Sequence, residues 1–308
     1  MISISPLPGR LEDRQLHYAG KQSMEHARIA PATPKKELVI ELLLLASITL
    51  AALLLRFYKL GEWSFWGDEI FTLSLREDGF NYSFWRKSLA SLLIQATTAS
   101  LGPSEWSARL VPAIIGVLSI PVLHFPIRKI FGTAVSLIAG ALLAVSTWHL
   151  YWSQNARFYT LLLLFYSLAL LTFLIGIEQD RPVYLILSLL FLGLAVRERL
   201  LALFLLPVVV GYLILLKALR FPSPPGLRLR NLLLYFGPLL ILALLFASPY
   251  LRNFDQWMAG FGTPNNSPFW LLAGVVYYTG IPTICSAGFA ALGLLFQKDR
   301  AALLLSLS

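Results

Sequence analysis

Two adjacent carboxylates, Asp68 and Glu69, stand about a dozen residues after a long apolar run ends. Four aromatic residues lie within a few positions of the pair: Trp63, Phe65, Trp66 and Phe71. Poor solvation and mutual repulsion both raise the pKa of carboxyl groups, which suits general-base chemistry. The pattern is therefore consistent with a general base within this pair. A cap on a short helix starting at Glu69 is an equally good interpretation of Asp68.

A second polar cluster, Ser153-Gln-Asn-Ala-Arg-Phe-Tyr159, separates two apolar runs. Arg157 carries a planar guanidinium, which can bind a phosphate with two parallel hydrogen bonds at a membrane surface. Asn155 is placed to cap the helix that follows. The alternative for Arg157 is an interfacial side chain that merely reaches toward water.

A third cluster, Arg197-Glu198-Arg199, joins two apolar runs with almost no loop between them. Three charges at such a place are costly unless they face a polar cavity or one another. Ligand binding and internal ion pairing are therefore both open. Glu105 and Arg109, at the start of another apolar run, fit either a site or an i,i+4 helix pair.

The amino-acid composition indicates which kind of secondary structure positions these residues. Hydrophobic residues make up 57% of the 308 residues, charged residues only 13%, and the mean hydropathy is +0.70. Soluble domains carry roughly 25% charged residues. Apolar blocks of about 20 residues match the thickness of a bilayer core. The sequence predicts an all-α, polytopic transmembrane helical bundle.

The apolar runs also predict how the chain is organised. Residues 1–37 are expected to form a disordered cytoplasmic tail and residues 38–308 a transmembrane domain. The external loop 58–107 is expected to carry two amphipathic helices at the membrane surface, Glu69–Leu75 and Ser83–Ile94. The run after Arg300 is too short to span, which predicts a chain truncated at its C-terminus. The predicted spans are Leu38–Phe57, Ala108–Ile127, Thr133–Trp152, Tyr159–Ile177, Val183–Val196, Leu200–Leu216, Leu232–Ser248 and Phe269–Phe296.

The basic residues predict an orientation and argue against nucleic acid. The net charge of +9 resides mainly in the N-terminal tail and in alternate short loops, without a compact basic face. The positive-inside rule then places the N-terminus in the cytoplasm of a multi-pass plasma-membrane protein. Four arginines fall on the opposite side, against this rule: Arg109, Arg157, Arg197 and Arg199. Charges that oppose the rule indicate a function, so the site is expected to be extracytoplasmic.

Familiar cofactor motifs are absent from the sequence. There is no Gly-Lys-Ser/Thr phosphate loop, no Gly-x-Gly-x-x-Gly, and no Cys/His cluster with metal spacing. We therefore predict no cofactor and no metal ligands, although the requirement for a divalent cation stays open.

Three stretches in order resemble the polyprenyl-phosphate-dependent glycosyltransferases of the GT-C class. The likeness is to bacterial relatives of protein O-mannosyltransferases and of lipid A aminoarabinose transferases. It extends over about Arg56 to Leu216. The stretches are Arg56-Phe-Tyr-Lys-Leu-Gly…Trp66-Gly-Asp-Glu69, Gly102-Pro-Ser-Glu-Trp-Ser-Ala-Arg-Leu110 and Ser153-Gln-Asn-Ala-Arg-Phe-Tyr159. Asn155 stands where such proteins commonly have an acid.

This resemblance implies an inverting transfer of a sugar from a polyprenyl-phosphate donor to an acceptor hydroxyl outside the cytoplasm. The acceptor is a lipid, glycan or protein, and the oligomeric state is open. The resemblance implies that Asp68 is the base, supported by Glu69. It also implies that Arg157 binds the donor phosphate, and Arg109, Arg197 and Arg199 are the lower-ranked candidates for this role. Glu105 and Asn155 are further candidates. The alternatives are a transporter or flippase of a lipid-linked substrate, or a non-catalytic paralogue.

Overall fold

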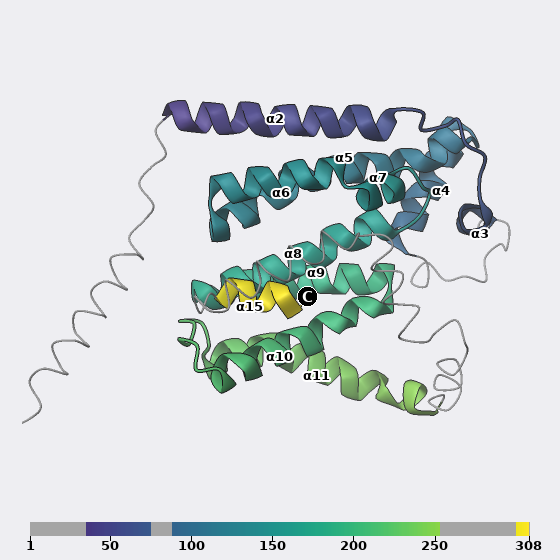
Figure 1. The fold of residues 1–308 in the computed structure, drawn as a ribbon. Helices are drawn as coiled ribbons and strands as arrows, with labels where there is room; N and C mark the ends of the chain where they lie inside the picture. Colours follow the sequence, from purple (N-terminus) through teal and green to yellow (C-terminus); the bar gives the residue numbers. More distant parts are fainter. Residues whose placement is uncertain (1–34, 75–87, 253–299, 308) are drawn as a thin grey trace, which may run out of the picture. The chain divides into compact units, whose positions relative to one another are not determined.

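The structure is a computed structural model that describes residues 35–74, 88–252 and 300–307. Over these residues the regular secondary structure is helical throughout, which confirms the predicted all-α class (Figure 1). The chain divides into two compact units, Met1–Leu43 and Leu44–Ser308. All contacts given below lie within the second unit.

The predicted external loop contains α3 and α4 and joins α2 to α5. Helix α5 begins at Glu105, earlier than predicted, because Ser104 and Ser107 form a reciprocal capping box. Helix α4 extends to Leu101, beyond the predicted end at Ile94, and stops where Gly102 adopts a positive φ of 86°. The bounds are α2 Lys35–Phe57, α3 Gly67–Ser74, α4 Leu89–Leu101 and α5 Glu105–Phe131.

The predicted third span is bent. It consists of α6 (Thr133–Val145) and α7 (Thr147–Ser153), which meet at an angle of 60°. Ser146 lies between them, and its side chain accepts a hydrogen bond from the N–H of His149, which starts a new helix. Helix α8 (Tyr159–Glu178) then returns the chain to the other end of the bundle.

Among the later helices, α9 packs on α8, α11 packs on α9, and α10 packs on α15. Helix α9 (Pro182–Glu198) lies along α8, and the buried core between them includes Phe173, Leu185 and Leu192. The sixth predicted span begins as a short 3₁₀ segment, η1, before it continues as α10. The remaining bounds are η1 Leu200–Phe204, α10 Leu205–Ala218, α11 Leu229–Arg252 and α15 Arg300–Leu307.

Several helices can cross a membrane by length and composition. Within the described ranges, four helices qualify, namely α2, α5, α8 and the η1–α10 stretch Leu200–Ala218, and the bent pair α6–α7 adds a fifth. Helix α5 stays continuous through Pro112, Pro121 and Pro126, as neighbouring helices allow in membrane bundles. Helix α9 has 17 residues and measures about 25 Å at 1.5 Å per residue, slightly less than a bilayer core.

Some predictions fall outside the described residues. These are most of the cytoplasmic tail, the first part of the amphipathic helix Ser83–Ile94, and the span Phe269–Phe296. The described part of that second amphipathic segment begins at Ser88, whose side chain accepts a hydrogen bond from the N–H of Ser91 and caps α4.

Candidate active site

Glu69 lies in the first turn of α3, and its side chain is fully buried. It accepts two hydrogen bonds from the guanidinium of Arg109: Nε donates to Oε1 at 2.9 Å and Nη2 to Oε2 at 2.8 Å. The backbone N–H of Ala156 also donates to Oε1, at 2.7 Å. Paired bonds of this kind are the strongest arginine–carboxylate contacts. Glu69 therefore fastens α3 to α5 and to the loop before α8.

Arg109 uses its remaining donors on backbone carbonyls. Nη1 donates to the carbonyls of Leu60 and Trp63, at 3.3 and 2.8 Å, and Nη2 donates to that of Ser64 at 3.3 Å. A guanidinium has five N–H donors, and these three bonds with the two to Glu69 occupy all five. Arg109 pairs with Glu69 rather than with the half-buried Glu105, its neighbour at i−4. This geometry favours a role in holding the segment between α2 and α3.

Asp68 is placed quite differently from its neighbour. Its carboxylate is 50% exposed and lies 3.3 Å from Nη2 of Arg157, whose own side chain is buried. Nη1 of Arg157 also donates to the backbone carbonyl of Asp68 at 2.8 Å and to Oγ1 of Thr72 at 3.0 Å. Two residues from separate predicted clusters are thus in contact, and the carboxylate of Asp68 remains open to a ligand.

Arg157 keeps donor capacity that Arg109 lacks. Its buried Nε–H has no hydrogen-bond partner among the described residues. An unpaired buried donor is costly, and such groups are rare in folded proteins. Arg157 therefore has one donor that no hydrogen bond within the described residues satisfies.

The ring of Phe158 contacts two guanidinium groups, those of Arg157 and Arg199. The guanidinium carbons of Arg157 and Arg199 lie 5.2 and 4.4 Å from the ring centroid of Phe158. Both distances are within the range of cation–π attraction. Arg199 is exposed, whereas Phe158 is buried. The structure therefore gathers Asp68, Arg157 and Arg199 at one end of the bundle.

Within the Arg197–Arg199 cluster, Glu198 is engaged with the start of α4. Its side chain is buried and accepts hydrogen bonds from the backbone N–H groups of Leu89 and Ala90, at 2.8 and 3.2 Å, at the start of α4. Glu198 lies beyond the predicted span, which ends at Val196. Burial raises its pKa to about 7, although the hydrogen bonds from Ala90, Leu89 and Ser88 and the charge of Arg197 oppose the shift. The half-buried Arg197 occupies the last turn of α9.

Asn155 is engaged with aromatic residues instead of capping α8. Its Oδ1 accepts a hydrogen bond from the indole N–H of Trp66 at 2.8 Å, and its Nδ2 donates to the carbonyl of Tyr151 at 2.6 Å. The ring of Trp152 lies between Trp66 and Tyr159, with centroid distances of 6.4 and 3.9 Å. The rings of Phe158 and Tyr159 lie within 6.0 Å of the Arg157 guanidinium carbon and so border the Asp68–Arg157 contact.

Residues 87–252, more than half of the chain, match the family model described as dolichyl-phosphate-mannose-protein mannosyltransferase. The chain belongs to this family. Neither the curated proteins nor the solved structures yield a significant match. The predicted resemblance is confirmed, and the chain is a multi-pass membrane glycosyltransferase of the mannosyltransferase type. Membership implies a lipid-linked sugar donor and a glycan or protein acceptor.

The matched range contains every arginine of the site in this mannosyltransferase-family protein, and it begins after Asp68 and Glu69. The acidic pair is therefore supported by geometry rather than by the match. As to metals, the described residues bring together no group of three or more His, Cys, Asp or Glu side chains that could hold an ion.

Sequence reasoning missed several residues that position this site. Thr72 was overlooked, although it follows Asp68 by four residues and so shares its helix face. The fully buried Arg56 was also missed as a positioning group. Its Nη2 donates to the carbonyl of Leu143 at 3.1 Å and to Nδ1 of His149 at 2.7 Å, across the bend between α6 and α7. Since a guanidinium only donates, His149 must accept through Nδ1 as a neutral imidazole.

Gln154 provides a second connection that the sequence did not indicate. Its Nε2 lies 3.2 Å from the carbonyls of Leu55 and Arg56 and 2.9 Å from that of Tyr58, around the end of α2. The loop that carries Arg157 is thus anchored to the same helix end that leads into the acidic pair.

Proposed function

We propose that this protein transfers a hexose or pentose from a polyprenyl-phosphate donor to an acceptor hydroxyl, with inversion, on the extracytoplasmic side of the plasma membrane. The contact between Asp68 and Arg157 carries the proposal. It joins a half-exposed carboxylate to a buried guanidinium that has an unpaired donor. One group can take a proton and the other can bind a phosphate, as the transfer requires.

Asp68 is the proposed base. The acceptor hydroxyl binds at the open side of its carboxylate and attacks the anomeric carbon of the donor sugar. A new bond forms between the acceptor oxygen and this carbon, and the hydroxyl proton passes to Asp68. Its half-exposed position lets an acceptor approach from solvent, which a closed ion pair would prevent.

Arg157 is the proposed phosphate ligand. As the bond between the anomeric carbon and the phosphate oxygen breaks, the electron pair stays on the polyprenyl phosphate. The guanidinium of Arg157 stabilises the charge that develops there. Arg199, stacked on Phe158 beside Arg157, adds a second positive charge on the exposed side.

Glu69 and Arg109 take positioning roles in this proposal. Every donor of Arg109 is used within the protein, and the carboxylate of Glu69 is fully buried against it. We therefore place Arg109 behind the site instead of on the donor phosphate. A single displacement that uses one carboxylate as base inverts the anomeric centre.

The test is an assay of turnover in membranes that contain the full chain. Polyprenyl-phosphate hexoses and pentoses are supplied in parallel, and release of free polyprenyl phosphate is followed over time. We expect Asp68→Asn to lose turnover while the protein still inserts. Glu62→Gln is the matched control, because Glu62 is an exposed carboxylate of the same loop, paired with Lys59 at 2.8 Å. This variant should keep full turnover.

The same assay separates the alternatives. Undiminished turnover in Asp68→Asn would remove Asp68 from the role of base. A transporter would move the lipid-linked sugar across the membrane without releasing lipid phosphate, and a non-catalytic paralogue would do neither. Repeating the assay with a chelator determines whether a divalent cation is required.

Orientation has a separate test that does not depend on activity. Cys285 is the only cysteine of the chain, so Cys285→Ser provides a background without thiols. We expect Glu62→Cys in this background to react with a membrane-impermeant maleimide in intact cells. Lys217→Cys should react only after the membrane is opened. The reverse result would place the site in the cytoplasm.

A further inference from the structure

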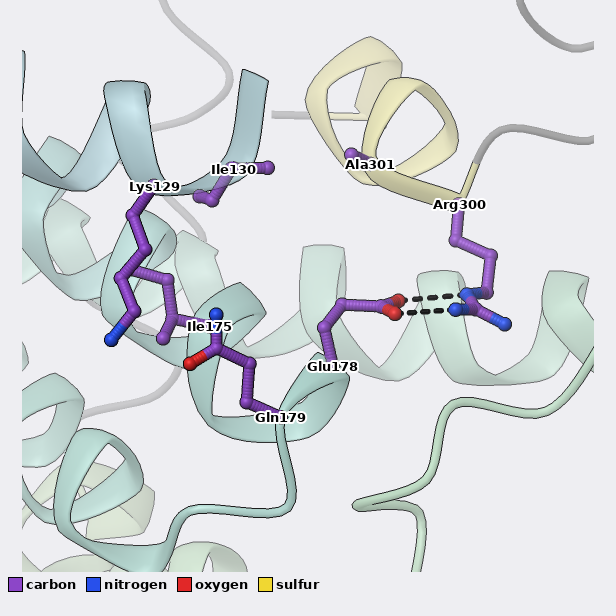
Figure 2. A pocket seen from close by; sticks show the side chains of 7 residues that line it. All are labelled: Lys129, Ile130, Ile175, Glu178, Gln179, Arg300 and Ala301. Atoms are coloured by element: carbon purple, nitrogen blue, oxygen red, sulfur yellow. Dashed lines mark hydrogen bonds and ion pairs between the residues drawn. The ribbon is translucent and has the colours of Figure 1, made fainter. Parts of the chain in front are cut away.

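A cavity of about 450 Å³ lies where α5, α8 and α15 end or begin. This volume is within the range of small-molecule sites. Figure 2 shows Lys129 and Gln179 on one side of the cavity and the pair Glu178–Arg300 on the other. Ile130 and Ile175 add an apolar part to the lining. The cavity is therefore amphipathic, with charged and apolar walls together.

The distance between the cavity and the candidate active site follows from the lengths of α5 and α8, which contribute residues to both. Lys129 follows Arg109 by twenty residues in α5, which corresponds to about 30 Å at 1.5 Å per residue. Helix α8 likewise runs from Tyr159, beside the candidate site, to Glu178 at the cavity. About 30 Å is also the thickness of the hydrocarbon core, so a candidate site at one membrane surface would place this cavity near the other surface.

Among the described residues that line the cavity, the charges leave an excess of one positive charge. Nε of Arg300 donates to Oε1 of Glu178 at 2.8 Å, and the second bond of this pair involves Nη2 and Oε2. These two charges therefore compensate each other. Lys129 is exposed, and its ammonium donates to the hydroxyl of Tyr184 and lies 4.0 Å from the centroid of that ring. An ammonium has three N–H donors, so two remain after the bond to Tyr184.

We propose that this cavity binds the headgroup of an anionic phospholipid that carries one phosphodiester charge. The ammonium of Lys129 and the amide of Gln179 contact the phosphate, and Ile130 and Ile175 contact the glycerol and the first methylene groups. An excess charge of +1 matches a headgroup of net charge −1 and does not match a zwitterionic one. This inference goes beyond the transfer reaction and does not rest on it.

The test measures lipid retention by the full chain. The protein is purified in detergent from bilayers that contain phosphatidylglycerol and phosphatidylcholine in equal amounts, and the retained lipids are counted by native mass spectrometry. We expect wild type to retain phosphatidylglycerol preferentially. In Lys129→Gln this retention should fall about fivefold, as expected for one lysine near a lipid surface.

The matched control is Lys217→Gln. Lys217 is exposed in the last turn of α10, at the same end of the bundle, and does not line the cavity. The Lys217→Gln substitution removes one positive charge, as Lys129→Gln does, and should leave the retention of phosphatidylglycerol unchanged. An equal loss in both variants would reduce the effect to general surface charge and overturn the proposal. Gln179→Leu provides a second variant, with a smaller expected loss.

A soluble anion is the other source of the same chemistry. Inorganic phosphate is therefore added at increasing concentration before the mass measurement. We expect it to leave the retained phosphatidylglycerol in place, because the apolar part of the cavity holds the lipid as well. Displacement by millimolar phosphate, or equal retention of the two phospholipids by wild type, would overturn a lipid site.

Discussion

Glu69 and Arg109, forty residues apart in sequence, form a doubly hydrogen-bonded ion pair in which neither side chain is more than 4% exposed. The neighbouring carboxylate of Asp68 stays half exposed beside Arg157. Two adjacent acids thus have separate partners and separate environments. The buried pair fixes α3 against α5, and the open carboxylate is the one left for chemistry.

Breaking this pair should destabilise the fold. Glu69→Gln leaves Arg109 as a buried cation without its counter-charge, which costs about 3–5 kcal/mol in comparable pairs. We expect a markedly lower midpoint of thermal unfolding in detergent. Glu62→Gln removes an exposed partner of Lys59 and should change the midpoint little, because exposed pairs contribute at most about 1 kcal/mol. Similar midpoints for the two variants would contradict the buried pair as a structural anchor.

The double variant Glu69→Gln, Arg109→Gln separates positioning from catalysis. If Glu69 acts by holding Arg109, removal of both charges should restore part of the stability, since no uncompensated charge stays buried. Turnover should recover in proportion. Recovered stability with turnover still absent would instead return Glu69 to a direct role beside Asp68.

The different fates of Asp68 and Glu69 mark the limit of sequence reasoning. The adjacent acids were visible, and so was their aromatic surrounding. Their divergence comes from helix geometry, because successive residues at 3.6 per turn point about 100° apart. One side chain of α3 therefore faces the protein and the other faces outward. Which one faces inward depends on where Arg109 lies, and only the i,i+4 partner Glu105 could be derived locally.

The helices could be predicted from local sequence, whereas the bend at Ser146 and the contact of Glu198 were missed. The alternation of apolar runs and charged breaks predicted the helices well, because hydropathy depends only on local sequence. The bend at Ser146 had a local signal, a serine able to cap the helix starting at Thr147, which a continuous apolar run concealed. The contact of Glu198 with the start of α4 spans more than a hundred residues, and no periodicity indicates it.

Turnover should depend on the planar guanidinium of Arg157 as well as on its positive charge. Arg157→Gln removes the proposed stabilisation of the leaving phosphate, and such losses commonly reduce kcat by about 10²–10³-fold. Arg157→Lys keeps a charge but not the planar fork, so an intermediate kcat is expected. The measurement is initial-rate release of polyprenyl phosphate. Arg181→Gln, an exposed arginine that precedes α9, should keep the wild-type rate. A wild-type rate in Arg157→Gln would exclude this residue from the reaction.

Gly116 should not tolerate a side chain. A Cβ at this position of α5 would lie 2.2 Å from Oγ of Ser153, 2.8 Å from its Cβ, and 3.0 Å from Nε of Arg56. Overpacking of this kind costs about 1–3 kcal/mol, so Gly116→Ala should lower the unfolding midpoint. In Gly193→Ala, a Cβ would meet no atom within 4 Å, and the helix should gain stability by about 0.5–1 kcal/mol. The opposite order of the two midpoints would show that α7 does not pack against Gly116.

Glu198 should make stability depend on pH. Burial raises its pKa from the ordinary value of about 4.5 to about 7 in the folded protein. The folded state therefore holds the proton more tightly than the unfolded state. This contribution is fully present below pH 4.5 and is lost as the pH rises through 7.

Glu198→Gln provides the comparison, because a neutral amide keeps an acceptor for the N–H groups of Leu89 and Ala90 without a titrating charge. We expect wild type to lose stability relative to this variant between pH 5 and pH 8, by up to about 3 kcal/mol. Unfolding midpoints at several pH values within this window measure the difference. A difference that is constant with pH would mean that the carboxylate is already ionised at pH 5. In that event the hydrogen bonds from the start of α4 would outweigh the cost of burial.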